Sequence, residues 1–372
     1  MAGTTRRAAH PQFQAAYLIR LAAIIFAPVI LSGCYAGYIT HAAYEECRIL
    51  HARKPIDDVL AKKDLPEDIR AKLETALAVR KFAADDLGLN VGGAYKSVAP
   101  VDENAVIHVV MATPRDSLDP YTWWFPIVGS VPYRGYFEET DAIAEAARLE
   151  AEGLDTMVRP AIAFSSLGFF SDPLLSNLLN LDRVELAGVM IHELFHRTYY
   201  LASDAMFDES AATYVGSAGA VAFFAATEGE SAPSTIAARG ILDSDLKFAR
   251  FLLKEQARLL EIYMADLPQK ELDQRREEAF AAIKADYTAL EPSLSGLERF
   301  DLDKQPLNNA VLVNYMIYFH NLNNFATLQQ MNHGDLRATI EQIISIAKAH
   351  EEDPFYAISQ VVRTAPASSA AH

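Results

Sequence analysis

The stretch VMIHELFHR, residues 189–197, contains two histidines and a glutamate with the spacing of a metal site. His192 and His196 are four residues apart, and residues at that separation lie on one face of an α-helix, so their ring nitrogens can bind one ion. Glu193 follows the first histidine, and its carboxylate could take a proton from a water molecule that the ion activates. This pattern predicts a zinc hydrolase in which His192 and His196 bind the metal and Glu193 is the catalytic base.

The same pentapeptide also arises by chance in helices whose histidines have no function. Leu194 and Phe195 inside the motif are apolar, as is the run VELAGVMI before it, so the helix is expected to be buried. Two histidines and a glutamate are costly to bury without a partner, and a metal ion would be one. Asp182 and Glu185 form a D-x-x-E pair, which predicts a capped helix start just before the motif. The sequence therefore favours a buried helix that holds both ligands still.

A third ligand is expected in the segment FDESAATYVGSAGAVAFF, residues 207–224, which predicts a second buried helix. Glu209 would lie in its first turn, separated from His196 by twelve residues, and its side chain is long enough to reach across. Asp204 and Asp208 are alternative ligands, or acceptors for the outer ring nitrogens of the histidines. FDES also fits an ordinary helix start, with Asp208 as the N-cap and Glu209 compensating the helix dipole. We favour Glu209 as the third ligand.

Two histidines, one carboxylate and an open fourth position form a ligand set typical of hydrolytic zinc sites. Non-haem iron uses a similar set, but a glutamate beside the first histidine suits a site that activates water. Ala211, Ala212 and Gly216 have small or no side chains, which would let the second helix approach the first closely.

The rest of the chain predicts a helix-rich α+β fold, with a small sheet beside the HExxH helix. Short runs at 105–112 and 159–170 predict strands, and the aromatic, proline-rich and glycine-rich segment 117–137 between them predicts irregular or short-stranded structure. Apolar spacing predicts helices at 34–50, 65–89, 140–155, 243–267, 274–290, 308–331 and 334–350. We expect one mature domain over 34–362, with helical N-terminal and C-terminal parts around a β-containing catalytic core at about 100–220, and a disordered tail at 363–372.

The first 33 residues predict a signal peptide, because Arg6, Arg7 and Arg20 occur without acidic residues and an apolar run, LAAIIFAPVIL, follows. That run is short and contains a proline, so it is a poor transmembrane helix. LSGC, residues 31–34, resembles the bacterial lipobox, in which Cys34 would be lipidated; the alternative is a chance cysteine after an ordinary signal. Tyr35 stands where an Asp would favour the inner membrane, so we expect an envelope lipoprotein of the outer membrane, facing the periplasm.

Composition excludes one class of partner. The 372 residues carry a formal net charge of −16 and no lysine-rich or arginine-rich run, so no nucleic-acid partner is expected. Cys47 is the one cysteine besides Cys34, so the mature domain cannot form an internal disulfide, and we expect Cys47 to be a small buried residue.

Several blocks in one order resemble a family of bacterial lipoproteins described as predicted zinc aminopeptidases, within the gluzincin class of zinc peptidases. The blocks are SGC, RKFAADDLGL, WWFPIVGSVPYRGYF, AFSSLGFFSDPLL, HELFHRTYY, FDESAATYVGSAG and LNNAVL. The resemblance implies a gluzincin-like fold with bound Zn²⁺, in which His192, His196 and Glu209 are the ligands and Glu193 is the catalytic glutamate. The chain departs from the family at Asp208, where Asn is usual, and at Trp124 and Ser130, where Cys is common.

Such sites usually contain a Tyr or His that stabilises the oxyanion of the tetrahedral intermediate. Tyr136 and Tyr318 are the candidates we take forward, from a wider set that includes Tyr133 and Tyr315; each could instead be a packing residue. Arg134 could bind a substrate carboxylate or form a structural ion pair. The sequence identifies no residue that would bind the free amine of an aminopeptidase substrate.

The function expected from the sequence is zinc-dependent peptide hydrolysis in the bacterial cell envelope, as an aminopeptidase, with Glu193 activating a zinc-bound water. The strand that begins at Arg159 could pair with an extended peptide substrate. The alternatives are a zinc endopeptidase acting on envelope proteins and a non-catalytic metal-binding lipoprotein.

Overall fold

The computed structural model of the protein describes residues 47–101, 107–125, 129–136, 138–161, 172–296, 300, 302 and 306–364. The chain divides into two compact units, Met1–Arg53 and Lys54–His372. The first unit is described only over residues 47–53, where residues 47–52 are helical. Cys47 is exposed, so the prediction that it is buried is wrong. The predicted signal peptide, Cys34 and the tail from residue 365 lie outside the described residues.

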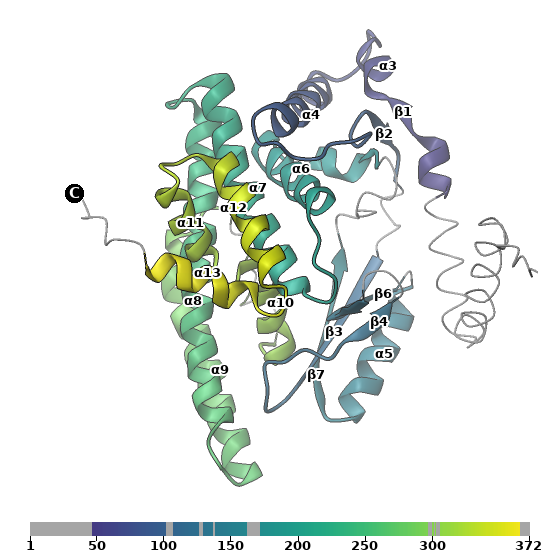
Figure 1. Cartoon of the computed structure of the whole chain (residues 1–372). Helices are drawn as coiled ribbons and strands as arrows, with labels where there is room; N and C mark the ends of the chain where they lie inside the picture. Colours follow the sequence, from purple (N-terminus) through teal and green to yellow (C-terminus); the bar gives the residue numbers. More distant parts are fainter. Residues whose placement is uncertain are drawn as a thin grey trace, which may run out of the picture. The chain divides into compact units, whose positions relative to one another are not determined.

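The second unit has the helix-rich α+β fold that the sequence predicts (Figure 1). In its described residues the largest antiparallel sheet has the order β6-β3-β7. The strands of this sheet are β3 (Ile107–Pro114), β6 (Tyr133–Tyr136) and β7 (Leu154–Ala161). The smaller sheets comprise β1 (Lys54–Pro55), β2 (Ser97–Ala99) and β8 (Leu174–Leu175), and the hairpin β4 (Trp123–Phe125) and β5 (Gly129–Val131).

The two predicted strands have different outcomes. The first is confirmed, because β3 covers all described residues of the predicted run. For the second, β7 begins at Leu154, directly after the turn at Gly153 with its φ of +89°, and reaches the predicted segment only at its end. Pro160 is tolerated there because β7 lies at the edge of the sheet among the described strands, so its missing N–H leaves no ladder bond unmade between them. Residues 162–170 of the prediction lie outside the described residues.

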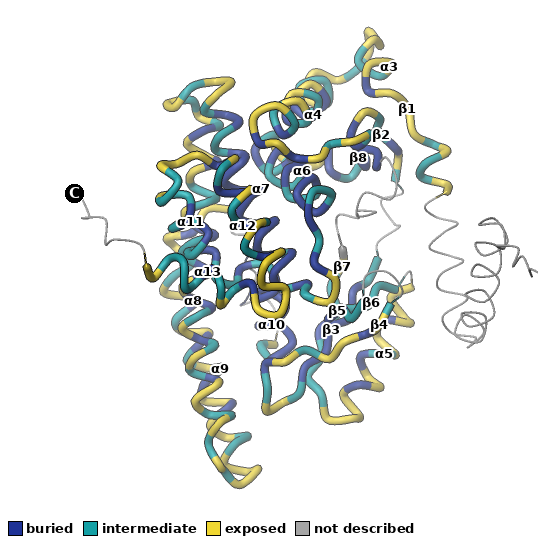
Figure 2. The backbone as a smooth tube through the Cα atoms, in the orientation of Figure 1, coloured by how far each residue is buried: buried dark blue, intermediate teal, exposed yellow. Residues whose placement is uncertain are grey.

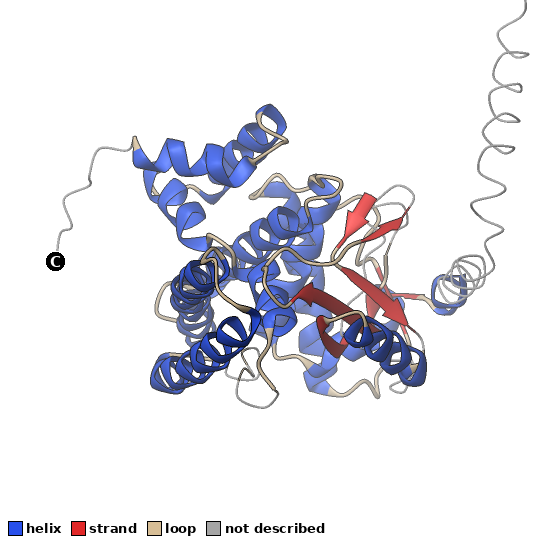
Figure 3. Cartoon of the chain, turned by 90° about the horizontal axis from the view of Figure 1, so that it is seen from below, coloured by secondary structure: helices blue, strands red, loops and turns tan. Residues whose placement is uncertain are grey.

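Helices cover both faces of this sheet (Figure 3). Helix α5 (Glu139–Ala151) packs on one face, over a cluster that includes Val110, Ala112 and Trp123. Because side chains alternate along a strand, Val109, Met111 and their neighbours on β6 and β7 project from the other face, against which α10 (Asn309–Phe319) packs. The side chains of the sheet that can reach α10 therefore come from this second face.

Two helices at the centre of the unit carry the predicted site, α6 (Arg183–Thr198) and α7 (Ala205–Glu228). Helix α7 is buried along most of its length, as the dark blue tube in Figure 2 shows, because α6, α8, α10, α11 and α12 all pack against it. The other helices are α3 (Ile56–Leu60), α4 (Glu67–Asp85), α8 (Pro233–Tyr263), α9 (Gln269–Leu290), α11 (Leu322–Met331), α12 (Leu336–Ala349) and α13 (Pro354–Arg363), with short 3-10 turns η1 (Ser176–Asn180) and η2 (Glu291–Ser293). No helix in the described part of the chain is both long and apolar enough to cross a membrane.

Most helix predictions are confirmed, including the consecutive pair α8 and α9, which pack on each other, although α8 begins at Pro233 and not at the predicted residue 243. Most of the predicted helix at 34–50 lies outside the described residues. The predicted helix at 308–331 is instead two helices, α10 and α11, because the chain turns at Asn321 with a left-handed φ of +54°. Asn adopts this conformation more readily than most residues.

Gly216 lets α6 and α7 pack at backbone distance. A Cβ atom added to Gly216 would lie 2.7 Å from the carbonyl oxygen of Gly188 and 3.1 Å from Cβ of His192. The two atoms that it would meet belong to helix α6, one of them to the backbone, so they cannot move aside without moving the helix. The prediction that Gly216 allows this close approach is confirmed.

We predict that Gly216→Ala destabilises the protein by about 2 kcal/mol, because the new methyl group must push α7 away from α6. Gly188→Ala is the matched control: its Cβ would meet the oxygen of Gly216 at an ordinary 3.8 Å, so it should be neutral or stabilising by up to about 1 kcal/mol from helix propensity. Denaturant unfolding of both variants in the presence of a chelator measures the difference. Equal stability of the two variants would contradict the tight packing.

Candidate metal centre

Helix α6 holds His192, Glu193 and His196 in place from a capped N-terminus. The side chain of Asp182 accepts hydrogen bonds from the backbone N–H groups of Val184 and Glu185, at 2.7 and 2.9 Å, and the Glu185 carboxylate accepts from the N–H of Asp182 at 3.3 Å. This is the predicted capping box. The buried apolar side chains between the histidines, Leu194 and Phe195, anchor the same turn in the core.

Helix α7 brings Glu209 to the histidines, although it begins one turn earlier than predicted. Asp204 is its N-cap and accepts from the N–H of Phe207 at 3.0 Å, so Glu209 lies in the second turn. Asp208 is not the cap: its Oδ1 accepts from the N–H of Leu201 at 2.9 Å and folds the connecting loop back onto α7. The expected role of Asp204 and Asp208 as acceptors for the histidine nitrogens thus has no hydrogen bond to support it among the described residues.

The three proposed ligand atoms converge on one point. Nε2 of His192 lies 3.1 Å from Nε2 of His196 and 3.1 Å from Oε2 of Glu209, and Nε2 of His196 lies 3.4 Å from the same oxygen. These three residues form a group that could hold a metal ion. Zinc ligands at about 2.0–2.1 Å from the ion, placed at the corners of a tetrahedron, are themselves about 3.3 Å apart, so the observed triangle has the right size.

Hydrogen bonds alone do not explain why the ligand atoms of His192, His196 and Glu209 lie so close together. Two imidazole nitrogens face each other, and they can share a hydrogen bond only if one carries the proton and the other does not. Nδ1 of His196 is buried without a partner in the described part of the chain. A cation between the two Nε2 atoms and Oε2 of Glu209 would satisfy these three atoms at once, so the donor set fits a metal ion.

Electrostatics also favours a cation here. Burial lowers the pKa of His196, but the charge of Glu209 and its hydrogen bond outweigh burial and raise that pKa to about 9. Burial likewise raises the pKa of Glu209, and the nearby His196 and the hydrogen bonds from both histidines outweigh it and hold that pKa below its usual range. The carboxylate is therefore ionised, and positive charge is stabilised beside it.

Glu193 is half-buried and makes no hydrogen bond or ion pair with the described residues. Its charge contributes to raising the pKa of Tyr95 and of Tyr318, after the larger effect of burial, so both phenols lie within range of the carboxylate. An unpaired carboxylate next to the first histidine is free to exchange protons with a bound molecule.

The structure separates the tyrosine candidates. Burial, followed by the charge of Glu209, raises the pKa of Tyr318 to about 12 and that of Tyr133 well above 10, which places both near Glu209. Tyr136 projects from the opposite face of β6 and packs against the cluster beneath α5. Tyr315 packs edge-on against Phe248 in the helical core. The positions therefore favour Tyr318 and Tyr133, and not Tyr136, as residues of the site.

Arg134 lies on the same side of β6 as Tyr136, with its guanidinium 5.1 Å from the centre of that ring. The hydrogen bond from Arg148 lowers the pKa of Glu145 on α5 against the opposite effect of burial, and the charge of Arg134 adds a smaller lowering. Arg134 therefore faces α5.

Arg159, on β7, was not singled out from the sequence. Its guanidinium donates to Tyr318 and to Asn314 on α10, and only the register of β7 on β3, which the sequence does not specify, brings it there.

Three residues depart from the family pattern: Asp208, Trp124 and Ser130. Burial raises the pKa of Asp208 to about 8, and a protonated carboxyl group, like the amide of Asn, offers both a donor and an acceptor. Trp124 and Ser130 are direct cross-strand partners in the hairpin β4–β5, so the two positions where the family commonly has Cys face each other. Neither position contributes to the metal-ligand group.

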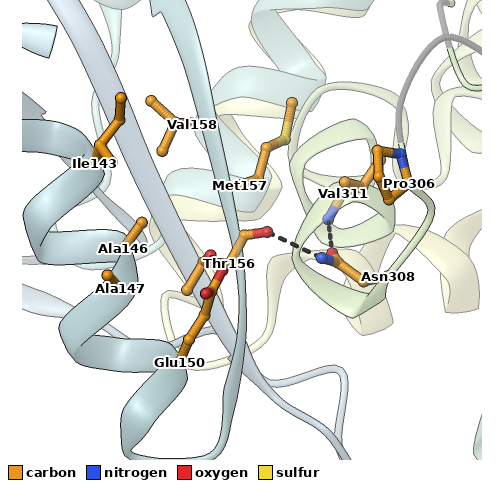
Figure 4. A pocket seen from close by; sticks show the side chains of 10 residues that line it. All are labelled: Ile143, Ala146, Ala147, Glu150, Thr156, Met157, Val158, Pro306, Asn308 and Val311. Carbon is orange, nitrogen blue, oxygen red and sulfur yellow. Dashed lines mark hydrogen bonds between the residues drawn. The ribbon is translucent and has the colours of Figure 1, made fainter.

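A pocket of about 400 Å³ lies beside β7, between α5 and the start of α10 (Figure 4). Its lining comprises Ile143, Ala146, Ala147, Glu150, Thr156, Met157, Val158, Pro306, Asn308 and Val311. None of these residues belongs to the metal-ligand group. Asn308 closes part of the outer edge of β7, because its side-chain amide donates to the carbonyl oxygen of Thr156 at 2.9 Å.

Residues 37–355 match the family model described as "Putative aminopeptidase". The match covers most of the chain, including α6, α7 and α10. The chain belongs to this aminopeptidase family. Membership supports peptide hydrolysis as the general activity and a peptide or protein as the substrate. No curated protein and no solved structure matches the chain.

We predict that a divalent transition-metal ion binds the wild-type protein and raises its Tm, by an amount equivalent to about 4 kcal/mol at a thousandfold excess over Kd. Glu209→Gln should abolish most of this rise, because it removes the anionic ligand, whereas Glu193→Gln, the same change one residue from a ligand, should keep it. Calorimetry with and without chelator tests both variants. A metal response that survives Glu209→Gln would remove Glu209 from the ligand set.

Proposed function

We propose that this protein is a zinc-dependent aminopeptidase of the bacterial cell envelope. The observation that carries the proposal is the convergence of His192, His196 and Glu209 within 3.4 Å of one another, in a chain of an aminopeptidase family. Two histidines and a carboxylate are the three protein ligands of a catalytic zinc site, whereas a structural zinc site would have a fourth protein ligand.

The ligands would be His192 and His196 from α6 and Glu209 from α7. Bound zinc would polarise the scissile carbonyl and lower the pKa of a water molecule. Glu193, which has no partner among the described residues, takes the proton of the attacking water and returns it to the leaving amine. Tyr318 donates its phenolic proton as a hydrogen bond to the oxyanion that forms on the carbonyl.

The outer edge of β7 is the surface on which the substrate backbone binds. Its inner side pairs with β3, and no strand in the described part of the chain pairs with its outer side. An extended peptide can add to such an edge through backbone hydrogen bonds. Asn308 already occupies the carbonyl of Thr156, which limits how far the peptide can extend in that direction and favours a short bound segment, as in an exopeptidase.

The decisive test is peptide hydrolysis by wild type and Glu193→Gln on paired substrates with free and acetylated N-termini. We predict that wild type releases N-terminal residues from free peptides only, and that Glu193→Gln lowers kcat by about 10²–10⁴-fold with zinc retained, because the general base is lost. Glu185→Gln on the same helix is the control and should be fully active, since Gln also completes a capping box.

Internal cleavage of acetylated peptides would make the protein an endopeptidase. Activity unchanged in Glu193→Gln would exclude the proposed proton transfer. Absence of hydrolysis in wild type that binds zinc would leave a non-catalytic metal-binding lipoprotein.

We propose in addition that the chain is exported and anchored by lipid on Cys34, on the basis of the arginine-rich start, the apolar run and LSGC. Mass spectrometry of the mature protein from its membrane fraction should then show a diacylated or triacylated N-terminal cysteine, and Cys34→Ser should abolish this modification. A mature N-terminus elsewhere, or an unmodified Cys34, would contradict the anchor.

A further inference from the structure

Arg159 connects the sheet to α10 at the position of Tyr318. Its Nε donates to Oδ1 of Asn314 at 2.8 Å, its Nη2 donates to the hydroxyl oxygen of Tyr318 at 3.2 Å, and its Cζ lies 5.8 Å from the centre of the Tyr318 ring. Asn314 and Tyr318 are one helical turn apart and so lie on one face of α10. The planar guanidinium therefore holds two successive turns of one helix face against β7.

The environment of Arg159 differs from that of an ordinary structural arginine. On the same face of β7, the carboxylate of Asp155 forms an ion pair with the buried Arg276 and balances its positive charge. Arg159 is half-buried, yet its partners are an amide, a phenol and, at 3.4 Å, the carbonyl of Pro160. Among the described residues no carboxylate lies within 4 Å of its guanidinium, so no ion pair neutralises it. Its charge and its hydrogen bond act on the pKa of the phenol in the direction opposite to burial and to the charge of Glu209.

Helix α10 is also fixed to the ligand helix. The hydroxyl of Ser210, the fully buried neighbour of Glu209, donates to the carbonyl oxygen of Ile317 at 2.9 Å and accepts from the N–H of His320 at 3.0 Å. These two bonds lie on either side of Tyr318 along the chain. The phenol is thus fixed from α7 through Ser210 and from the sheet through Arg159.

We propose that Arg159 is a positioning residue that orients Tyr318 and strengthens it as a hydrogen-bond donor to the reacting carbonyl. This inference rests on the proposed function, because it assigns a role to a neighbour of Tyr318 in the same reaction. The hydroxyl oxygen accepts from Arg159, so the phenolic proton must point away from the guanidinium. The adjacent positive charge withdraws electron density from the O–H bond, which makes the phenol a better donor as negative charge develops on the substrate oxygen.

The test is a double-mutant cycle on the zinc-loaded full-length protein, with kcat and KM measured for a peptide that the wild type hydrolyses. We expect Tyr318→Phe to lower kcat by about 10²-fold and Arg159→Gln by about tenfold, both with unchanged KM, because each weakens an interaction made in the transition state. In the Tyr318→Phe background, Arg159→Gln should change kcat less than about twofold, since its effect passes through the missing hydroxyl.

Two further variants keep the test decisive if Arg159→Gln folds poorly. Arg159→Lys retains the charge but loses the fork, so it should restore part of kcat. Asn314→Ala leaves Arg159 in place with one anchor removed; it should lower kcat about threefold, and only when Tyr318 is present. Zinc content identifies folded variants, and Arg148→Gln, on the exposed side of α5, is the control for general loss of an arginine.

Additive losses from Arg159→Gln and Tyr318→Phe would overturn the proposal. So would a loss confined to KM and to peptides with a free C-terminal carboxylate, which would make Arg159 a direct substrate contact. If Glu193→Gln and Tyr318→Phe are both as active as wild type, the proposed function fails first; if Glu193→Gln is inactive and the cycle is additive, only the role of Arg159 fails.

Discussion

The close contact between α6 and α7 is the constraint on which the rest of the structure depends. Two histidines from one helix and a glutamate from the next must meet within hydrogen-bonding distance, which long side chains alone cannot ensure. The missing side chain of Gly216 removes the obstacle, and the buried faces of both helices hold the distance once it is set. The surrounding helices make α7 one of the most deeply buried elements, so a shift of Glu209 would disturb packing on several sides at once.

Around this pair, helix α10 joins two parts of the fold that the chain forms separately. It packs on the sheet on one side and on α7 on the other, and its polar residues face the junctions: Asn314 and Tyr318 meet Arg159, while the backbone around Tyr318 meets Ser210. The candidate centre is therefore assembled from the consecutive helices α6 and α7 together with β7 and α10, and the contacts of α10 join residues more than a hundred positions apart in sequence. Its polar groups lie in a buried environment, where unbalanced charge has large effects, and Glu209 and His196 show that effect in opposite pKa shifts.

The sequence predicts the local part of this arrangement well. The HExxH spacing, the capping box at Asp182 and the small residue at Gly216 are all visible in the sequence because each acts within a helix or between consecutive helices. It predicts the start of α7 one turn too late, since Asp204 and Asp208 are equally good caps and only the fold of the connecting loop distinguishes them. Nothing local indicates Arg159, or decides between Tyr133 and Tyr136, because strand register and the approach of α10 select which side chains face the centre. The roles of these residues in binding metal and in catalysis stay predictions.

The bond from Asn308 to Thr156 also bears on which chains can add to the outer edge of β7. None of the strands that the structure describes pairs with this edge, and an open edge presents unpaired backbone groups to any chain, including another copy of the same protein. Asn308 occupies one carbonyl of that edge, and Pro160 contributes no N–H to it. A second molecule would find too few consecutive backbone groups to build a continuous intermolecular sheet, so β7 can remain accessible without becoming a starting point for aggregation.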